Sequence, residues 1–537
     1  MPSLTPTPAT GGSRVRRRLI VLILLALLVI GLVALWLQRF GQPEDFDRME
    51  SQFKYGSIGA DHPLAQAPIP YWLWKALPAV LPPETTVMSG GQPPNNGRKG
   101  LEAFGLVSES KVGLTAFQLQ DLPTLDRPIG FSSRRVFGMD FVGMNCAFCH
   151  LGSYKNAEGA KTQLVLGGTG NAVDIEKYFL YLFSAITDRR FNADLLMPAV
   201  DKELARQGAQ LGWVQRLMYR HVLIPFLPVY LRSLEKDKFD FIIPNNPTTL
   251  PEFGPGRVDT WALYKRTFAT QLGGDGTPGI SDFTSIWNQK ARAGMQLHWD
   301  GNTNVLVERN VVSALSLIGK NIEYLDFNRM SRVTNWIDNL LPPSYPDRYP
   351  SDPKNPADMA INTELLARGT TLFNQGCARC HAPNGDRVGR VELLADVGTD
   401  PERLKDFTPA LRNGLNKLGT AQWQLRHFEL QGGYVNSLLD GAWMRAPYLH
   451  NGSVPTMRDL LNRPEDRPKQ FCRGDEVYLW KQLGYRWEPV VVNSLATCPD
   501  SYLYDTRTPG NSNSGHLWGT DLSDADKDAL MEFLKTL

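Results

Sequence analysis

The chain has 537 residues, of which 42% are hydrophobic, 10% aromatic and 21% charged. This composition is typical of globular proteins and excludes a collagen-like, mainly disordered or disulfide-scaffold protein, and the length predicts two or three folded units. The 57 basic and 55 acidic side chains leave a net charge of +2. Such a balance provides no strong field for a polyanion, so we expect no nucleic-acid partner.

The first expected element is an apolar run over residues 19–37 that contains no charged residue. As a helix it is about 28 Å long, close to the hydrocarbon thickness of a bilayer. The positive-inside rule then predicts a cytoplasmic N-terminus over residues 1–18, a single-pass signal anchor in the inner membrane, and a large periplasmic domain. A cleaved signal peptide is the alternative, although the run is longer than a usual signal-peptide core. The arginines that set this orientation are Arg14, Arg16, Arg17 and Arg18 before the run and Arg39 after it.

Three segments follow the run. Residues 38–65 are polar and are expected to form a tether. Residues 69–82 are rich in Trp and Tyr, and we expect them to pack on the folded domain rather than on a membrane. A glycine-rich turn (Gly167, Gly168, Gly170) leads into a helical pattern of which Asn171 is the expected N-cap.

A domain boundary is expected at residues 342–358, which contain six prolines and indicate a stiff linker. After it, apolar residues at helical spacing predict one helix over 362–375 and another over 523–537. Ser523, followed by Asp526, is a helix-start signal. A small helical unit bracketed in this way resembles the cytochrome c fold.

Two Cys-x-x-Cys-His strings carry the most specific signal in the chain. Two thiols three residues apart reach two vinyl groups at one porphyrin edge, and the histidine that follows ligates the iron. A redox dithiol or half of a zinc site are the alternatives, and the histidines count against both. We predict two covalently bound haem c groups and no NAD, since no Gly-x-Gly-x-x-Gly follows a strand. The residues of the strings are Cys146, Cys149 and His150, and Cys377, Cys380 and His381.

The two remaining cysteines are Cys472 and Cys498, 26 residues apart. In an oxidising compartment a disulfide between them is expected rather than two reactive thiols.

Six further histidines compete to be distal haem ligands: His62, His221, His298, His427, His450 and His516. Two stand out. His450 lies in the string that runs from Arg445 to Thr456, and His516 lies in a glycine- and serine-rich loop, expected to be flexible, just before the last helix. His221 lies in an apolar run broken by two prolines, where a core or gate-lining role is expected.

The two haem motifs, the string from His298 to Asn302 between them (His-Trp-Asp-Gly-Asn) and the string from Ala446 to Thr456 after them resemble the bacterial di-haem cytochrome c peroxidase superfamily. The similarity is greater to its rubber-oxygenase-like branch, and it covers about residues 90–537. It implies a mainly α fold of two cytochrome c-like haem domains with long irregular loops. The expected domains are residues 66–341, with a large insertion, and residues 359–537.

The resemblance also assigns roles. The first haem is expected to react with O₂ or H₂O₂, the second to store electrons, and Trp299 to lie between them as the catalytic tryptophan. A Ca²⁺ ion between the domains is a further candidate cofactor.

The chain departs from the peroxidase pattern at the second haem. Pro464 stands where the peroxidases have a methionine ligand, so a histidine must replace it. The bis-His pattern of the rubber-oxygenase branch points to His516, with His450 as the alternative.

Another departure concerns acid–base groups, because Arg309 and Gly319 occupy the positions of the peroxidase Gln and Glu. The peroxide-cleaving groups are therefore expected to be altered. Glu308 is either a substitute or an ordinary solvated side chain.

We therefore expect a membrane-anchored periplasmic di-haem oxidoreductase with a reactive haem at His150 and a relay haem at His381. A small redox protein or a quinol-linked donor or acceptor is the expected partner. One alternative is a non-catalytic membrane-tethered electron-transfer cytochrome c, which predicts two six-coordinate haems. The other is a rubber-oxygenase-like dioxygenase, although a tethered chain fits poorly with cleavage of a polymer outside the cell.

Overall fold

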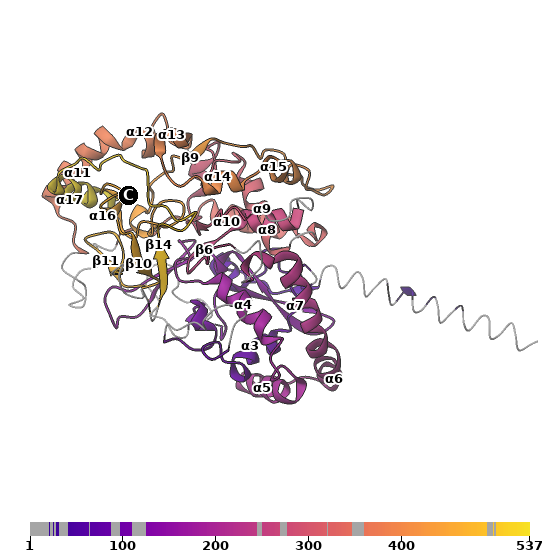
Figure 1. The fold of residues 1–537 in the computed structure, drawn as a ribbon. Helices are drawn as coiled ribbons and strands as arrows, with labels where there is room; N and C mark the ends of the chain where they lie inside the picture. The colour runs from indigo at the N-terminus through magenta and orange to yellow at the C-terminus, as the bar shows by residue number, and fades with distance from the viewer. Residues whose placement is uncertain are drawn as a thin grey trace, which may run out of the picture.

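The computed structural model describes residues 41–537 except residues 64, 87–96, 110–124, 244–249, 269–275, 319–320, 346–358, 491–497 and 499–500, together with five single positions at 21, 25, 28, 29 and 31. In Figure 1 the first half of the chain, coloured indigo to magenta, lies below the second half, coloured orange to yellow. The ribbon therefore separates into a lower and an upper part that follow the order of the sequence.

Helices dominate the lower part and its junction with the upper part (Figure 1). Helix α3 carries the aromatic segment at 69–82, and the indole of Trp74 packs on Phe131 with ring centroids 4.6 Å apart and donates to the Tyr178 hydroxyl. The expectation that this segment packs on the domain is confirmed. The helices are α2 (Met49–Tyr55), α3 (Tyr71–Val80), α4 (Ile175–Ala185), α5 (Ala193–Arg206), α6 (Trp213–Met218), α7 (Ile224–Lys238), α8 (Thr260–Phe268), α9 (Leu306–Ile318) and α10 (Phe327–Ile337).

The upper part is built around the packing of α11 on α17. Asn362 caps α11 by accepting from the amides of Glu364 and Leu365, and Ser523 caps α17. A Cβ at Gly369 would lie 2.0 Å from the carbonyl oxygen of Ala529, so only glycine permits this close approach. Both predicted helices are confirmed. The helices of this part are α11 (Thr363–Gly376), α12 (Ala378–His381), α13 (Leu394–Val397), α14 (Glu402–Asp406), α15 (Pro409–Leu415), α16 (Met457–Leu460) and α17 (Asp524–Leu534).

The strands form small antiparallel sheets, three-stranded in the orders β1-β2-β3 and β13-β10-β14, and two-stranded for the pairs β4-β5, β6-β7, β8-β9 and β11-β12. The longest pairing joins β2 to β3, with Phe131 opposite Met144. The strands are β1 (Gln42–Pro43), β2 (Phe131–Val136), β3 (Met139–Met144), β4 (Leu151–Tyr154), β5 (Gln163–Leu166), β6 (Arg257–Val258), β7 (Ser281–Asp282), β8 (Val391–Leu393), β9 (Gly433–Val435), β10 (Gln470–Arg473), β11 (Tyr478–Leu479), β12 (Gly484–Tyr485), β13 (Glu488–Pro489) and β14 (Tyr502–Asp505).

The predicted transmembrane anchor requires a correction. Within the described residues, the structure has no helix of the length and apolar character that a membrane crossing needs. Of the predicted span 19–37 only five positions are described, and the predicted cytoplasmic segment 1–18 lies outside the described residues. The structure is about 41% helical with 13% strand. The expected fold class, mainly α behind a transmembrane helix, is therefore wrong for this structure. The expected single-pass inner-membrane location with a periplasmic domain is wrong for the same reason.

Two local expectations in the first half also differ from the structure. The described residues between 49 and 63 do not form a free tether, because α2 packs into the core and buries Phe53 and Tyr55 completely. Asn171 is not the N-cap of α4, which begins at Ile175 behind Asp174. The Asn171 amide instead exchanges two hydrogen bonds of 3.0 Å with the backbone of Ser153.

The second half contains the predicted disulfide, because Cys472 and Cys498 are bonded to each other. Of the predicted linker 342–358, residues 346–358 lie outside the described residues. Buried ion pairs connect residues on the two sides of it: Lys265 pairs with Asp406, and Asp282 pairs with Arg473.

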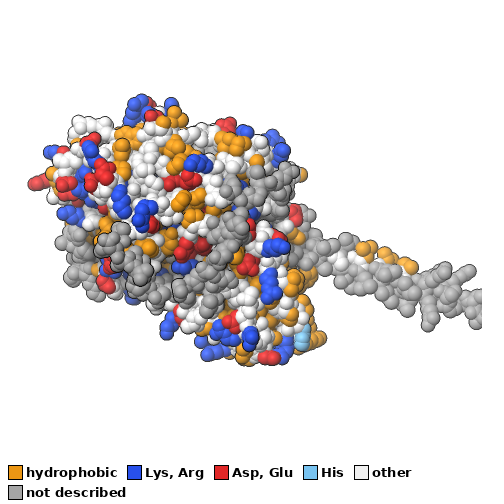
Figure 2. Space-filling model, viewed as in Figure 1, with side chains coloured by type: hydrophobic (Ala, Val, Ile, Leu, Met, Phe, Trp, Pro, Cys, Tyr) orange, Lys and Arg blue, Asp and Glu red, His pale blue; other side chains and the backbone are white. Residues whose placement is uncertain are grey.

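The face of the molecule that Figure 2 presents is mixed in charge. Figure 2 shows basic and acidic side chains interspersed over the face that it presents, with hydrophobic patches between them.

Candidate haem sites

The first Cys-x-x-Cys-His string follows β3 and forms a single 3-10 turn, Cys146–Phe148. Asn145 fixes this turn: its side chain accepts from the amide of Ala147 at 3.0 Å and donates to backbone carbonyls of the residues around α2. A Cβ at Gly170 would lie 2.0 Å from the carbonyl oxygen of Cys149. The glycine-rich turn that the sequence marks therefore packs directly against the motif.

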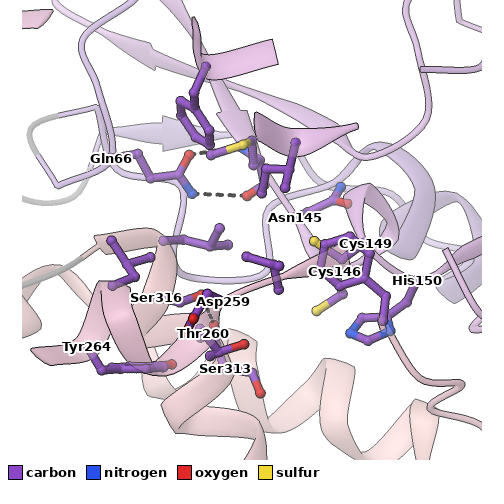
Figure 3. A pocket seen from close by; sticks show the side chains of 18 of the residues that line it. Gln66, Asn145, Cys146, Cys149, His150, Asp259, Thr260, Tyr264, Ser313 and Ser316 are labelled. Atoms are coloured by element: carbon purple, nitrogen blue, oxygen red, sulfur yellow. Dashed lines mark hydrogen bonds between the residues drawn. The ribbon is translucent and has the colours of Figure 1, made fainter. Parts of the chain in front are cut away.

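The string opens onto a cavity of about 260 Å³, which we call the first cavity. Figure 3 shows the two thiols and the His150 imidazole on one side, and Tyr264, Thr260 and Asp259 on the opposite side. Most of the lining is apolar, and the helices α4, α7, α8 and α9 contribute part of it. Apart from His150, the only histidine that lines it among the described residues is His298.

The imidazole of His150 is oriented for metal binding. Its Nδ1 lies 2.8 Å from the carbonyl oxygen of Thr284. A carbonyl oxygen only accepts, so Nδ1 carries the proton and Nε2 keeps its lone pair. Burial, followed by the charge of Arg309, lowers the pKa of His150 to about 4, which keeps the ring neutral.

The second string is placed by α11 and α12, with Cys377 at their junction. His381 repeats the arrangement of His150, because its Nδ1 lies 2.8 Å from the carbonyl oxygen of Ser437. Both cysteines and His381 line a cavity of about 430 Å³, the second cavity. His450, His516 and Trp518 also line it.

His381 and His516 face each other across the second cavity, with ring centroids 6.3 Å apart. Imidazole nitrogens bind metal ions at about 2.0 Å, so two histidines on opposite sides of one iron have centroids roughly 6 Å apart. The buried Nδ1 of His516 has no hydrogen-bond partner among the described residues. The residues present therefore fit a haem held between these two rings.

The loop that carries His516 is held in place, in contrast to the expected flexible loop. The buried guanidinium of Arg467 donates to the carbonyl oxygens of Asn513, Gly515 and His516 at 2.6, 2.9 and 3.2 Å. The amide of His516 donates to the carbonyl oxygen of Val397 at 2.7 Å. Sequence reasoning missed Arg467, which lies 49 residues before the histidine that it positions.

His450 is held differently. Its ring stacks on Tyr434 with centroids 4.2 Å apart, and its Nε2 lies 3.2 Å from the Tyr434 hydroxyl. Because that hydroxyl donates to the carbonyl oxygen of Asp400, it remains an acceptor for an Nε2–H of His450. The protein itself thus occupies the Nε2 atom of His450.

The two cavities share a wall formed by seven residues. Three of these residues, His298, Trp299 and Arg309, have side chains that can take part in reactions at a haem. The indole N–H of Trp299 donates to the carbonyl oxygen of Asp282 at 3.2 Å. The wall thus places Trp299 between the two candidate haem sites, while its catalytic role stays a prediction. The residues of the shared wall are Asp282, Phe283, Thr284, Ile286, His298, Trp299 and Arg309.

Two residues that the sequence singled out have other places. Glu308 is neither a solvated side chain nor a cavity residue: it is buried and accepts from the amides of Arg426 and His427 and from the His427 ring. His221 lies exposed on the π-helical turn Tyr219–Leu223, so the expected core or gate-lining role is wrong. His62 is buried against Tyr324 and lines neither cavity.

The thiols of both strings lie in surroundings unsuited to thiolate chemistry. Burial raises the pKa of Cys146 to about 12 and that of Cys377 to about 11. Neutral thiols are poor zinc ligands and poor redox nucleophiles, which disfavours both alternatives to haem attachment. Within the described part of the chain, no group of three or more His, Cys, Asp or Glu side chains is placed to hold a metal ion. The calcium ion therefore stays a prediction without a candidate ligand set.

Comparison with known proteins supports this assignment. Residues 433–472 match the family described as RoxA-like, cytochrome c-like. The matched segment runs from β9 to β10 and contributes Tyr434, His450 and Met457 to the lining of the second cavity. The chain is therefore related to RoxA-like cytochromes c, which implies a bound haem c and a haem cytochrome oxidoreductase.

Two curated relatives come from Sinorhizobium fredii. The uncharacterized protein y4iM is 33% identical over 299 residues, which are 48% of this chain and 64% of y4iM. The uncharacterized protein y4iJ is 27% identical over 257 residues, which are 36% of this chain and 41% of y4iJ. The chain thus spans less than two thirds of the length of either relative.

Proposed function

We propose that the chain is a di-haem c-type oxidoreductase in which the haem at His150 reacts with O₂ or H₂O₂ and the haem at His381 relays electrons. One observation carries this proposal: among the described residues, the second cavity has two imidazoles, those of His381 and His516, at a spacing suited to one iron, and no such pair is found in the first cavity. The first cavity has a mainly apolar lining, in which His150 lies opposite Tyr264, Thr260 and Asp259. Bound haem would supply redox chemistry at iron, with an open coordination position at the first site and a filled one at the second.

The protein's own residues support this division of roles. The Thr284 and Ser437 carbonyls fix the two proximal imidazoles, Arg467 fixes the His516 loop, and the apolar lining of the first cavity excludes water and favours small neutral ligands. The position of Trp299 in the shared wall supports its role as a stepping group between the sites. A small redox protein is the proposed electron partner.

Mass spectrometry and carbon monoxide binding test the proposal. The full chain is expected to carry two covalent haem groups, and the double variant Cys377→Ala/Cys380→Ala one. The reduced protein is expected to bind carbon monoxide at a single haem, and the double variant is expected to retain that binding. Binding at neither haem would favour the electron carrier without catalysis, and loss of binding in the double variant would place the reactive iron at the second site.

A further inference from the structure

The shared wall contains an imidazole that the proposed function has not used. The backbone of His298 is in the left-handed region, with φ 62°. A non-glycine residue keeps this conformation only where its surroundings enforce it, and such positions gather at functional sites. Here the amide of Leu297 donates to the carbonyl oxygen of Thr303 at 2.7 Å and closes the turn. The ring, packed edge-on to Trp261, is therefore held in one place beside both cavities.

A chain of two hydrogen bonds fixes which nitrogen of His298 carries the proton. The side-chain amide of Asn302 donates to the Asp300 carboxylate at 3.1 Å, so its oxygen is the atom that faces His298 Nδ1 at 2.7 Å. Because that oxygen only accepts, Nδ1 must donate. The Nε2 atom then keeps its lone pair, and it has no hydrogen-bond partner among the described residues.

Arg309 supplies a positive charge to the same wall. Its guanidinium donates to the Asn310 side chain at 3.1 Å, and no carboxylate of the described residues pairs with it. Burial, followed by the charge of Arg292, lowers the pKa of Arg309 only to about 10, so the side chain stays positive near neutral pH. An unpaired cation beside both cavities favours an anion formed there.

The charged groups around His298 keep the ring neutral. Burial lowers its pKa to about 4, and Arg309 and Arg403 act in the same direction, against the carboxylate of Asp300. The aromatic neighbours Trp261 and Phe428 are uncharged. A neutral imidazole with a free Nε2 is the form of histidine that can accept a proton during a reaction.

We propose that His298 is the base of the first site: its Nε2 accepts the proton that hydrogen peroxide releases, and the guanidinium of Arg309 stabilises the hydroperoxide anion that remains. The O–H bond of the peroxide breaks, an N–H bond forms on His298, and the electron pair stays on oxygen, so the step needs no other reactant. This inference rests on the proposed function, because it requires the first haem site to admit a protic ligand. His298 and Arg309 thereby take the place of the Gln and Glu of the peroxidase pattern.

Cyanide association tests the step without turnover, because hydrogen cyanide must also lose a proton to bind as an anion. In the oxidised full chain with both haems attached, His298→Gln is expected to slow cyanide association about a hundredfold at pH 7. The matched control is His427→Gln, which removes an imidazole bonded through Nδ1 to Glu308 on α9 but lining neither cavity. In His427→Gln the cyanide association rate is expected to equal that of the wild type. An unchanged rate in His298→Gln, or a low-spin to high-spin change of the first haem that marks His298 as an iron ligand, would overturn the proposal.

The pH profile gives a second measurement that does not need the His298 variant to fold. In the wild type the association rate is expected to fall as the pH drops through about 4, because protonated His298 no longer accepts a proton. Arg309→Gln removes a charge that lowers this pKa, so the midpoint of the profile should move to higher pH and cyanide should bind more weakly. A midpoint that stays or falls contradicts the inference. If the wild type binds neither cyanide nor carbon monoxide, both the proposed function and the inference about His298 fail.

Discussion

The guanidinium of Arg473 lies 2.9 Å from the carboxylate of Asp282, and both side chains are almost fully buried where β10 meets β7. The same Asp282 donates its amide to the carbonyl oxygen of His450 and accepts from the Trp299 indole through its own carbonyl. Asp282, which precedes the predicted linker, thus connects the shared wall to both the matched segment and β10, which follow that linker.

Removing one partner of this pair should be costly. Arg473→Met leaves the Asp282 carboxylate buried without its main countercharge, and we expect the free energy of unfolding to fall by about 3–5 kcal/mol. Urea denaturation followed by circular dichroism measures the change. The control is Arg135→Met, which breaks an exposed pair with Asp140 and should cost less than about 1 kcal/mol. Equal losses in the two variants would contradict the role given to the buried pair.

Replacing His516 should change the spin state of the second haem. His516→Ala removes the ring opposite His381, so a low-spin signal is expected to become high-spin and the potential to shift, as electron paramagnetic resonance and redox titration would show. His450→Ala is the comparison, because the Nε2 of His450 is already bonded to Tyr434. A spin change that occurs only in the His450 variant would reverse the assignment.

Trp299 can be tested against a tryptophan with the same hydrogen-bonding pattern. Trp299→Phe and Trp287→Phe each remove an indole N–H that donates to a backbone carbonyl at 3.2 Å, but Trp287 lines only the second cavity. We expect electron transfer between the haems, followed after flash reduction, to slow by about tenfold or more in the first variant and to stay unchanged in the second. Equal rates would leave Trp299 as a packing residue.

The buried state of His450 predicts acid sensitivity. Burial, followed by the charge of Arg403, lowers its pKa to about 3, against about 6.5 in an unfolded chain. Because the folded pKa is depressed, the unfolded chain takes up a proton that the folded chain does not, and stability falls as the pH drops from about 6.5 towards 3. Between pH 7 and pH 5 this one group should account for about 2 kcal/mol of the loss in unfolding free energy. His450→Gln should show a correspondingly smaller loss in urea titrations at the two pH values, and parallel losses in variant and wild type would refute the assignment.

The part of the site that could be predicted is the part encoded locally. The haem strings are five consecutive residues each, and the helices α11 and α17 follow from apolar spacing and from Asn362 and Ser523 at their starts. The family resemblance, not the local sequence, points to His516. Its contact with Arg467 could not be predicted, because the two residues are 49 positions apart in the sequence. Glu308 was misjudged for the same reason, because its partner His427 lies 119 residues away and only the folded chain brings them together.

The two faces of the second cavity are far apart in the sequence, so one face is synthesised well before the other. The attachment string ends at His381, and His516 follows 135 residues later (516 − 381). Helix α17, which packs on α11 just ahead of Cys377, begins 143 residues after His381 (524 − 381). The second cavity therefore remains open on one face until the His516 loop and α17 have been made, and a cofactor can enter from that side before then. In pulse-labelled cells, haem attached at Cys377 and Cys380 should appear on chains that a protease still cuts ahead of α17.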